Sequence, residues 1–239
     1  MSTVCLAYCS PGEVATTFHE SISMLKDRDP RIVGHVSMVS GPRISGARND
    51  MVRMFLSHPK KPEWLLMLDA DMIFPDDLVD QLLEASNPKV RPVVGGLCFG
   101  GGRVGIPFPT LYTLTDPKTN NGRMTKVVLD YPRDALCKVD ATGAACLFMH
   151  RDVLLQMAEQ YGKTPDGYSN PHPWFSETVH QGFEYGEDWT FCMRLKQMGI
   201  PLYVHTGIRL GHDKRHVYDE EFYHAMRRAF PDKYKGVSS

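Results

Sequence analysis

The stretch Trp64-Leu65-Leu66-Met67-Leu68-Asp69-Ala70-Asp71 decides the fold, because five apolar residues run without a break into two carboxylates. A continuous apolar run of this length is typical of a strand that is buried on both faces, as in a parallel sheet. Asp76–Leu83 follows Pro75 with helical spacing, and an acid in a first turn suits the helix dipole. The stretch therefore predicts a buried strand that ends in two acids and is followed by a helix.

Residues 1–100 alternate strands and helices around this stretch. Apolar runs predict strands at Thr3–Tyr8, Ile32–Val39 and Val93–Gly96, and helical spacing predicts helices at Glu13–Leu25 and Ile44–Leu56. Strands separated by helices indicate a mostly parallel sheet with right-handed crossovers. Ligands bind such sheets outside the carboxyl ends of the strands, which is where Asp69 and Asp71 are expected.

Shorter elements are predicted in the second half of the chain. The strands are expected at Leu111–Leu114, Met124–Leu129, Leu136–Thr142, Ala145–Met149 and Leu202–Val204, and the helices at Arg151–Gln160, Glu187–Met198 and Glu220–Phe230. Gly162–Gly186 shows no period, and a long irregular segment in a compact domain is often functional. We expect one α/β domain over 1–239, with a mostly parallel central sheet flanked by helices and a smaller second sheet.

Composition excludes several classes of protein. The chain has 239 residues and a formal net charge of -1, with acids and bases mixed along it, so nothing predicts a nucleic-acid partner. No apolar run approaches eighteen residues and no signal peptide is recognisable, which predicts a cytosolic protein without a membrane span. The six cysteines form no CxxC pair, and several sit in apolar runs, as expected for buried thiols in a reducing compartment.

Asp69 and Asp71 are the first candidate site. Two carboxylates two residues apart at an exposed strand end can converge on one hard cation, and Mg²⁺ or Mn²⁺ takes oxygen ligands while keeping positions open for phosphate. An EF-hand calcium loop is excluded, because Ile73 and Phe74 stand where that loop needs an oxygen ligand and a glycine. A solvated turn with a helix-capping acid remains an alternative interpretation of the pair.

Glu187 and Asp188 open a predicted helix. Acids in a first turn are commonly partners of the helix dipole. This helix, however, follows the irregular segment, where an acceptor could sit. Asp188 is the candidate general base for an attacking hydroxyl, and Glu187 the candidate for orienting or binding acceptor hydroxyls. Within the irregular segment, Trp174 and Phe175 either stack on a sugar or an acceptor peptide or simply anchor the loop.

A charged segment follows the last predicted strand. His212 could be a third metal ligand through a neutral imidazole nitrogen, and nitrogen beside carboxylates favours Mn²⁺ over Mg²⁺. Lys214 and Arg215 could fold over a diphosphate. A solvated charged turn explains the same residues, and a zinc site from His212 and His216 lacks a second pair of ligands.

Taken together, these segments resemble the glycosyltransferase family 2-like enzymes with the GT-A fold. The matching pieces span residues 3–216 and are Ala47-Arg48-Asn49, Leu68-Asp69-Ala70-Asp71, Thr142-Gly143-Ala144, Gly186-Glu187-Asp188-Trp189-Thr190-Phe191 and Gly211-His212. The resemblance implies a Rossmann-like fold and the transfer of a sugar from a nucleoside diphosphate sugar to a hydroxyl of a glycan, a small molecule or a protein side chain. Residues 1–100 would form the nucleotide-binding half and residues 101–239 the acceptor-binding half.

The resemblance also implies where the donor nucleotide lies. It places the base and ribose near Tyr8, Ser10 and Arg48. Many relatives read the base with an Asp at the end of the second strand, but this chain has Val39-Ser40-Gly41-Pro42 there, so the base is not predicted.

Roles at the metal and at the transferred sugar follow from the same resemblance. Asp71 is the main metal ligand, Asp69 lies near the ribose or the metal, and His212 is a further ligand. The Gly143 turn lies under the transferred sugar, and Asp188 is the base if the reaction inverts. Some retaining relatives share the Glu-Asp pair, so the stereochemistry stays open. The length resembles that of a small bacterial or bacteriophage enzyme rather than a processive synthase.

Two other functions are weighed against this one. Sugar nucleotidyltransferases usually carry a glycine-rich, basic signature right after the first strand, whereas Cys9-Ser10-Pro11-Gly12-Glu13 contains no Lys or Arg. A non-catalytic sugar-nucleotide-binding or carbohydrate-binding protein would show no Mn²⁺-dependent hydrolysis of a donor. The oligomeric state is not predicted by any feature of the sequence.

Overall fold

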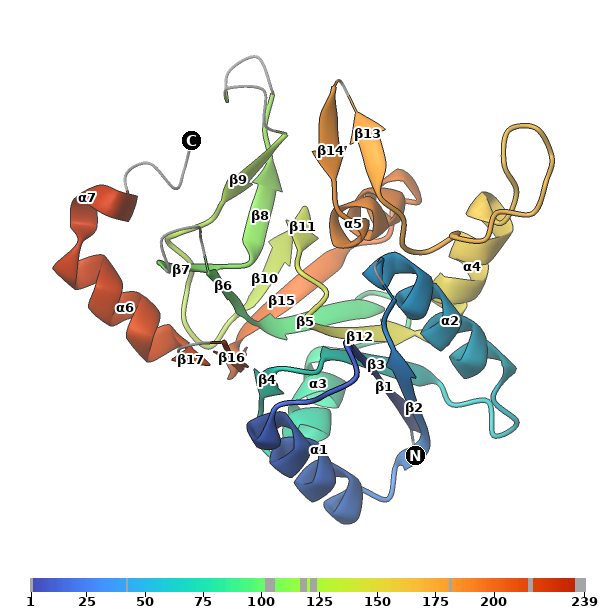
Figure 1. Cartoon of the computed structure of the whole chain (residues 1–239), viewed down its shortest axis with the longest axis horizontal. Coiled ribbons are helices and arrows are strands. Elements are labelled where there is room, and N and C mark those ends of the chain that lie inside the picture. The colour runs from blue at the N-terminus through green and yellow to red at the C-terminus, as the bar shows by residue number, and fades with distance from the viewer. Residues whose placement is uncertain are drawn as a thin grey trace.

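A seven-stranded sheet forms the centre of the protein (Figure 1). The computed structural model describes residues 2–41, 43–101, 106–116, 120, 124–180, 182–214 and 217–234. The sheet contains β1 (Val4–Ser10), β2 (Ile32–Val39), β3 (Trp64–Asp69), β5 (Val93–Leu97), β10 (Leu136–Val139), β12 (Cys146–His150) and β15 (Leu202–Arg209), in the order β10-β15-β5-β12-β3-β1-β2. All but β10 and β12 run in one direction, so the predicted mostly parallel sheet is confirmed.

Helices cover both faces of this sheet. They are α1 (Thr16–Arg28), α2 (Ile44–Ser57), α3 (Leu78–Ala85), α4 (Arg151–Tyr161) and α5 (Glu187–Gln197), with α6 (Glu220–Ala229) and α7 (Pro231–Tyr234) beyond the sheet edge. In Figure 1, α1 and α3 lie on the lower side and α2, α4 and α5 on the upper side. Alternate residues of β1 point to opposite faces of the sheet and belong to two separate hydrophobic cores. Leu6 lies in the core beneath α1, and Ala7 lies in the core beneath α2.

Four smaller sheets lie beyond the carboxyl ends of the parallel strands in the described part of the chain. The predicted second sheet is present as β11 (Ala141–Thr142), β8 (Leu111–Leu114) and β9 (Thr125–Val127). The other small sheets are β6 (Phe99–Gly101) with β7 (Pro107–Pro109), β13 (Thr178–His180) with β14 (Phe183–Tyr185), and β4 (Met72–Ile73) with β16 (Gly211–Asp213) and β17 (Val217–Tyr218). The sheet β17-β16-β4 brings the charged segment after β15 next to the end of β3.

The predicted single strand Leu136–Thr142 was wrong. It divides at Asp140 into β10 of the central sheet and β11 of the second sheet. The Asp140 carboxylate accepts hydrogen bonds from the Leu114 backbone at 2.8 Å and from Lys196 Nζ at 2.5 Å. These bonds hold Asp140 between β8 and α5. At this residue the chain passes from the central sheet into the second sheet.

Trp174 and Phe175 anchor the long segment and do not form a stacking platform. Both are buried; Trp174 Nε1 donates to the Leu154 carbonyl at 2.8 Å, and Phe175 stacks on Phe191 with ring centroids 4.7 Å apart. The stacking role weighed for them is therefore wrong, because no face of either ring is left for a ligand.

Asn49 on α2 holds this segment in place. Its Nδ2 donates to the carbonyls of Ser45 and Phe175, each at 2.6 Å, and its Oδ1 accepts from the backbone nitrogens of Trp174 at 3.2 Å and Phe175 at 3.4 Å. The side chain is fully buried. These bonds give a physical reason for an asparagine at this position of the helix.

Replacing Asn49 by Ala is expected to lower the free energy of unfolding by about 1–3 kcal/mol, because buried backbone groups of the segment lose their partners. Urea denaturation measures the change. Asp50→Ala on the same helix is the matched control, since Asp50 makes an exposed ion pair with Arg53 that contributes about 1 kcal/mol or less. Equal losses in the two variants would contradict the role given to Asn49.

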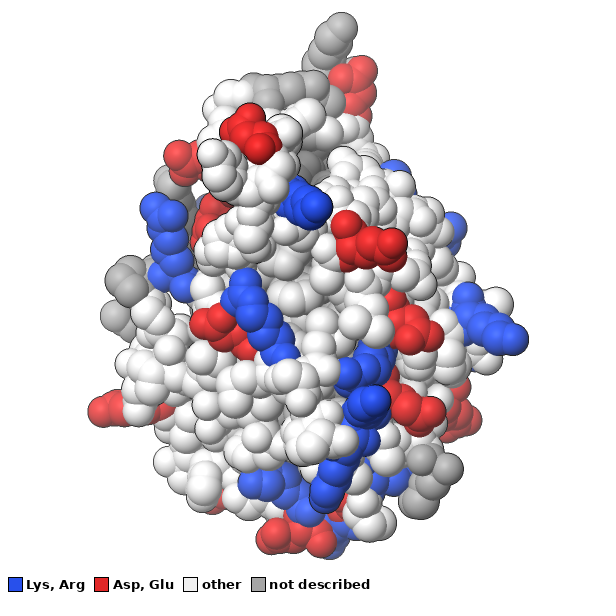
Figure 2. Space-filling view, turned by 90° about the vertical axis from the view of Figure 1, so that its right-hand side faces the viewer, with Lys and Arg blue, Asp and Glu red and all other residues white. Residues whose placement is uncertain are grey.

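The surface charges and the cysteines match the expectations from composition. Basic and acidic side chains are interspersed over the face seen in Figure 2. All six cysteines are free and all except Cys137 are buried, and burial raises the pKa of both Cys5 and Cys146 to about 12. Among the helices in the described ranges, none is long and apolar enough to cross a bilayer.

Candidate functional site

The two acids of the deciding stretch lie at the carboxyl edge of the central sheet. Asp69 is the last residue of β3, and its backbone nitrogen donates to the Ala145 carbonyl at 3.1 Å. The side chains of Asp69 and Asp71 are partly exposed, at 27% and 28%. Directly after them, β4 pairs antiparallel with β16, and Met72 stands opposite His212. This pairing explains why His212 comes close to Asp71 from the other end of the chain.

The side chains of Asp71 and His212 face each other. His212 Nδ1 lies 2.9 Å from the Phe99 carbonyl, which can only accept, so Nδ1 carries a proton. Nε2 lies 3.2 Å from Asp71 Oδ1, and among the described residues the two buried atoms have no partner other than each other. A doubly protonated ring would pair with the carboxylate, whereas a neutral ring would leave both atoms to a cation. A cation between them would satisfy both. A ring nitrogen that donates to a backbone carbonyl is also the usual support of a metal-binding histidine.

The charges around Asp71 favour its ionised form. Burial alone would raise the pKa of Asp71, but His212 and Lys214 Nζ, which contacts Oδ2, outweigh burial and lower it to about 2. Burial likewise opposes the charged form of His212, yet the Asp71 carboxylate raises the pKa of its ring. Lys214 thus lies where it could meet a diphosphate bound at Asp71. Arg215 and His216 fall outside the described residues.

Asp69 is paired differently from Asp71. Its Oδ1 accepts from Arg48 Nη2 at 2.7 Å, and Arg48 Nη1 donates to Glu187 Oε1 at 2.6 Å. Within the part of the chain that the structure describes, no three His, Cys, Asp or Glu side chains gather as a metal site. The structure therefore brings together Asp71 and His212 and attaches Asp69 to Arg48 and Glu187.

Glu187 and Asp188 lie in the first turn of α5, after Gly186. Asp188 Oδ1 accepts from the Trp189 backbone nitrogen at 2.7 Å. Burial raises the pKa of both carboxyls, and the charge of Arg48 opposes this rise in each. The charge of Asp69 also acts on Asp188, so the acids of β3 and α5 belong to one electrostatic cluster.

The Gly143 turn lies against Asp188. A Cβ at position 143 would stand 3.8 Å from Asp188 Oδ2 and 3.7 Å from the Thr110 side chain. Tyr112 of the second sheet faces the same carboxylate: burial, with the charge of Asp188 adding to it, raises the pKa of Tyr112 to about 12. Glycine at position 143 therefore leaves free space beside the candidate base.

Tyr8 and Ser10 lie at the end of β1, on the side of α1. The Tyr8 ring packs edge-on against Phe18, with centroids 4.9 Å apart, and against His35 at 5.4 Å. Ser10 Oγ accepts from the Gly12 nitrogen at 3.3 Å and so shapes the turn after β1. Both residues are thus near the carboxyl edge, while Arg48 approaches that edge from α2 on the opposite face.

Two surface pockets share Arg43 in their lining. One, of about 440 Å³, lies at the end of β2 and the first turns of α2 and is lined by Met38, Val39, Gly41, Arg43, Gly46, Ala47 and Asp50. The other, of about 560 Å³, lies against the β13–β14 hairpin and is lined by Arg43, Glu177, Thr178, Val179, Glu184, Tyr185 and Gly186. Arg43 borders both pockets. The sequence did not predict this hairpin. It therefore also did not point to the charged residues that line the hairpin pocket, which are Arg43, Glu177 and Glu184.

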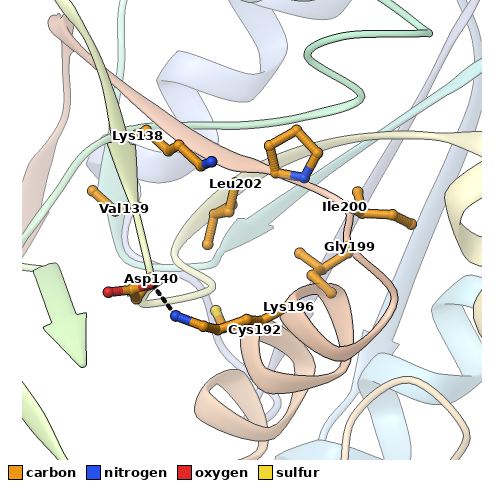
Figure 3. A pocket seen from close by; sticks show the side chains of 10 residues that line it. Lys138, Val139, Asp140, Cys192, Lys196, Gly199, Ile200 and Leu202 are labelled. Carbon is orange, nitrogen blue, oxygen red and sulfur yellow. Dashed lines mark hydrogen bonds and ion pairs between the residues drawn. The ribbon is translucent and has the colours of Figure 1, made fainter. Parts of the chain in front are cut away.

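A third pocket, of about 180 Å³, lies at the far end of α5 (Figure 3). Its carboxylate, Asp140, is paired with Lys196, as Figure 3 shows, and Cys192 at its wall is a buried thiol whose pKa burial raises to about 12. Asp140 is thus held in an ion pair and the Cys192 thiol stays protonated, so neither is placed to act as a base or a nucleophile.

Comparison with known proteins places the fold. No family model matches the sequence, and no curated protein is similar to it in sequence. Among solved structures, A197 from STIV aligns with a TM-score of 0.57 and 16% identity, over 90% of this chain and 86% of that one. GalNAc-T7 with UDP, GalNAc and Mn²⁺ aligns with a TM-score of 0.56 and 14% identity. The alignment covers 98% of this chain and 49% of GalNAc-T7, so the chain spans about half of that protein.

A further match is the catalytic domain of Drosophila beta1,4galactosyltransferase 7 in complex with xylobiose, with a TM-score of 0.50 and 15% identity. That alignment covers 92% of this chain and 75% of that one. Such low identities establish the arrangement of the backbone and not the activity. The central sheet, its flanking helices and these matches together show that the chain has the fold of the GT-A glycosyltransferases.

Proposed function

We propose that the chain is a metal-dependent glycosyltransferase that moves a sugar from a nucleoside diphosphate sugar to an acceptor hydroxyl. The observation that supports this most is the close approach of Asp71 Oδ1 and His212 Nε2, 3.2 Å apart, at the carboxyl edge of the sheet. This edge is where ligands of open α/β sheets bind. The fold shared with GalNAc-T7, whose structure contains UDP and Mn²⁺, agrees with this assignment.

On the donor side, Asp71 and His212 would hold the cation, with Asp69 near it or near the ribose. A nitrogen ligand beside a carboxylate favours Mn²⁺ over Mg²⁺. When bound, the ion would offset negative charge on the diphosphate leaving group. Lys214 contacts Asp71 and would bind the same diphosphate, and Tyr8 and Ser10 at the end of β1 would lie near the base and ribose.

On the acceptor side, Asp188 would take the proton of the attacking hydroxyl. Its neighbour Gly143 leaves room beside the carboxylate, and Glu187 would orient the acceptor. The pocket under the β13–β14 hairpin begins at Gly186, directly before these two acids. An acceptor held in that pocket would therefore reach Asp188 from the side of the hairpin.

A screen of sugar nucleotides with Mn²⁺ tests the proposed function. Purified protein is incubated with each donor, and release of nucleoside diphosphate is measured with and without a chelator. Slow hydrolysis of at least one donor that stops with the chelator is expected. Pyrophosphate release from a nucleoside triphosphate and a sugar phosphate would instead indicate a nucleotidyltransferase. No donor binding in calorimetry, with Mn²⁺ present, would overturn the proposal.

We expect the rate of transfer to fall as the solution is acidified. The pH at which this loss occurs should be higher than the pKa of an ordinary aspartate. Burial raises the pKa of Asp188 above 3.8, the charge of Asp69 adds to this, and Arg48 only partly opposes it. A base acts only when ionised, so activity is present above this raised pKa and is lost as the pH falls through it. The pH dependence of kcat measures the acid limb. A limb at or below 3.8 would contradict the assignment.

A further inference from the structure

Arg48 occupies an unusual position between the two acid pairs. It lies on α2 and is only 3% exposed. One terminal nitrogen donates to Asp69 at the end of β3, and the other donates to Glu187 in the first turn of α5. Asp69 and Glu187 belong to the donor side and the acceptor side of the candidate site. A single buried guanidinium therefore joins the two sides.

The surroundings of Arg48 keep it in this position. Its Cζ lies 5.9 Å from the centroid of the Phe175 ring, and the next residue, Asn49, is fixed by four hydrogen bonds to the backbone. A guanidinium can reach two separate carboxylates through its planar fork, which the single ammonium of lysine cannot match. A buried charge is also tolerated only when it is paired, so Asp69 and Glu187 are held where Arg48 needs them.

Arg48 and the surrounding carboxylates shift one another's pKa values. Burial would lower the pKa of Arg48, but Asp69, Glu187 and Asp188 outweigh burial and raise it. In return the charge of Arg48 opposes the burial that raises the pKa of Glu187 and Asp188. Without Arg48, three carboxylates would face one another in a partly buried space with no compensating charge.

We propose that Arg48 is a positioning residue, which holds the donor-side Asp69 and the acceptor-side Glu187 at a fixed separation and does not itself touch the donor. This differs from the contact with base and ribose that the family resemblance implies for Arg48. The effect of Arg48 on catalysis rests on the proposed function, whereas its bridging of the two carboxylates does not. The two parts are therefore tested separately.

The bridge is tested by unfolding in urea, with no ligand present. Arg48→Met leaves Glu187 without its partner, and Glu187→Gln then removes the unpaired charge. We expect the double variant to have a higher urea midpoint than Arg48→Met alone. A double variant whose midpoint is lower by the sum of the two single losses would overturn the bridge. If Arg48→Met does not fold, Arg48→Lys with and without Glu187→Gln gives the same comparison.

The positioning role is tested by kinetics of Arg48→Lys. The probe is the sugar nucleotide that the unmodified protein hydrolyses fastest with Mn²⁺. We expect KM for this donor to change by less than about twofold while kcat falls by about tenfold or more, since Arg48 itself makes no donor contact and its loss only releases the spacing of Asp69 and Glu187. Arg53→Lys on the same helix is the control and keeps both constants, because Arg53 lies on the surface and pairs with Asp50.

The outcomes separate the two proposals. A rise in KM of about tenfold with kcat unchanged would make Arg48 a donor contact and overturn the positioning role. If the unmodified protein hydrolyses no sugar nucleotide, the proposed function fails and the urea comparison still decides whether the bridge exists.

Discussion

An Asp71→Ala variant is expected to lose metal-dependent donor binding entirely. Asp71 Oδ1 faces His212 Nε2 at 3.2 Å, and the low pKa of Asp71, about 2, keeps its carboxylate ionised throughout the neutral range. Removing this carboxylate takes away one of the two atoms that face each other across the candidate cation position. Divalent cations of this size bind through one or two carboxylates together with substrate phosphates, so losing this carboxylate leaves His212 alone facing the cation position while Asp69 stays paired with Arg48.

Calorimetry with a donor identified in the screen, with and without a chelator, measures this loss. The matched control is Asp213→Asn, which changes a neighbouring carboxylate on β16 that accepts from Thr17 Oγ1 at 2.6 Å. The control should keep its chelator-sensitive binding. If Asp71→Ala binds the donor as tightly as the unmodified protein, and a chelator still weakens that binding, the metal lies elsewhere.

Asp188→Asn is expected to bind the donor normally and to lose about 10²–10⁴-fold in the rate of transfer, the usual contribution of a positioned base. The amide keeps the shape of the side chain and can still accept from the Trp189 nitrogen, so the fold of α5 is preserved. It cannot take a proton from a hydroxyl. The loss should therefore appear in kcat, with donor affinity unchanged.

Single-turnover transfer and donor calorimetry on the same preparation separate these effects. Glu184→Gln, which changes a carboxylate at the neighbouring hairpin pocket, is the comparison and should affect KM for the acceptor rather than kcat. Normal turnover by Asp188→Asn would remove Asp188 from the mechanism and leave Glu187 as the base to test.

The α/β core could be predicted because local signals coincide there. Trp64–Leu68 is apolar without interruption and fully enclosed in the structure, and the helices around it show their period in the sequence. The proximity of Asp71 and His212 was predicted from the ligand chemistry of the two residues and from the family resemblance, and not from any local structural signal. Nothing local indicates that β4 and β16 pair, because each is a short strand whose partner lies far along the chain.

The role of Arg48 was beyond local reasoning for the same reason. Its partners Asp69 and Glu187 are 21 and 139 residues away, and only the folded sheet places them on either side of α2. The β13–β14 hairpin, in contrast, did leave a signal. Thr178–Tyr185 is rich in β-formers around Gly182, whose φ of 82° is the left-handed conformation that favours glycine in a turn. The surrounding glycines and prolines obscured it.

The place of β12 bears on how the protein is made. β12 lies between β3 and β5 and pairs with both. In a growing chain that has emerged only to residue 100, one edge of β3 and one edge of β5 therefore lack their partner strand. Such open edges are templates for pairing with other chains. We therefore expect residues 1–100 not to complete their sheet ahead of the rest during synthesis, and the edges of β3 and β5 to stay open to pairing with other chains until Cys146–His150 arrives.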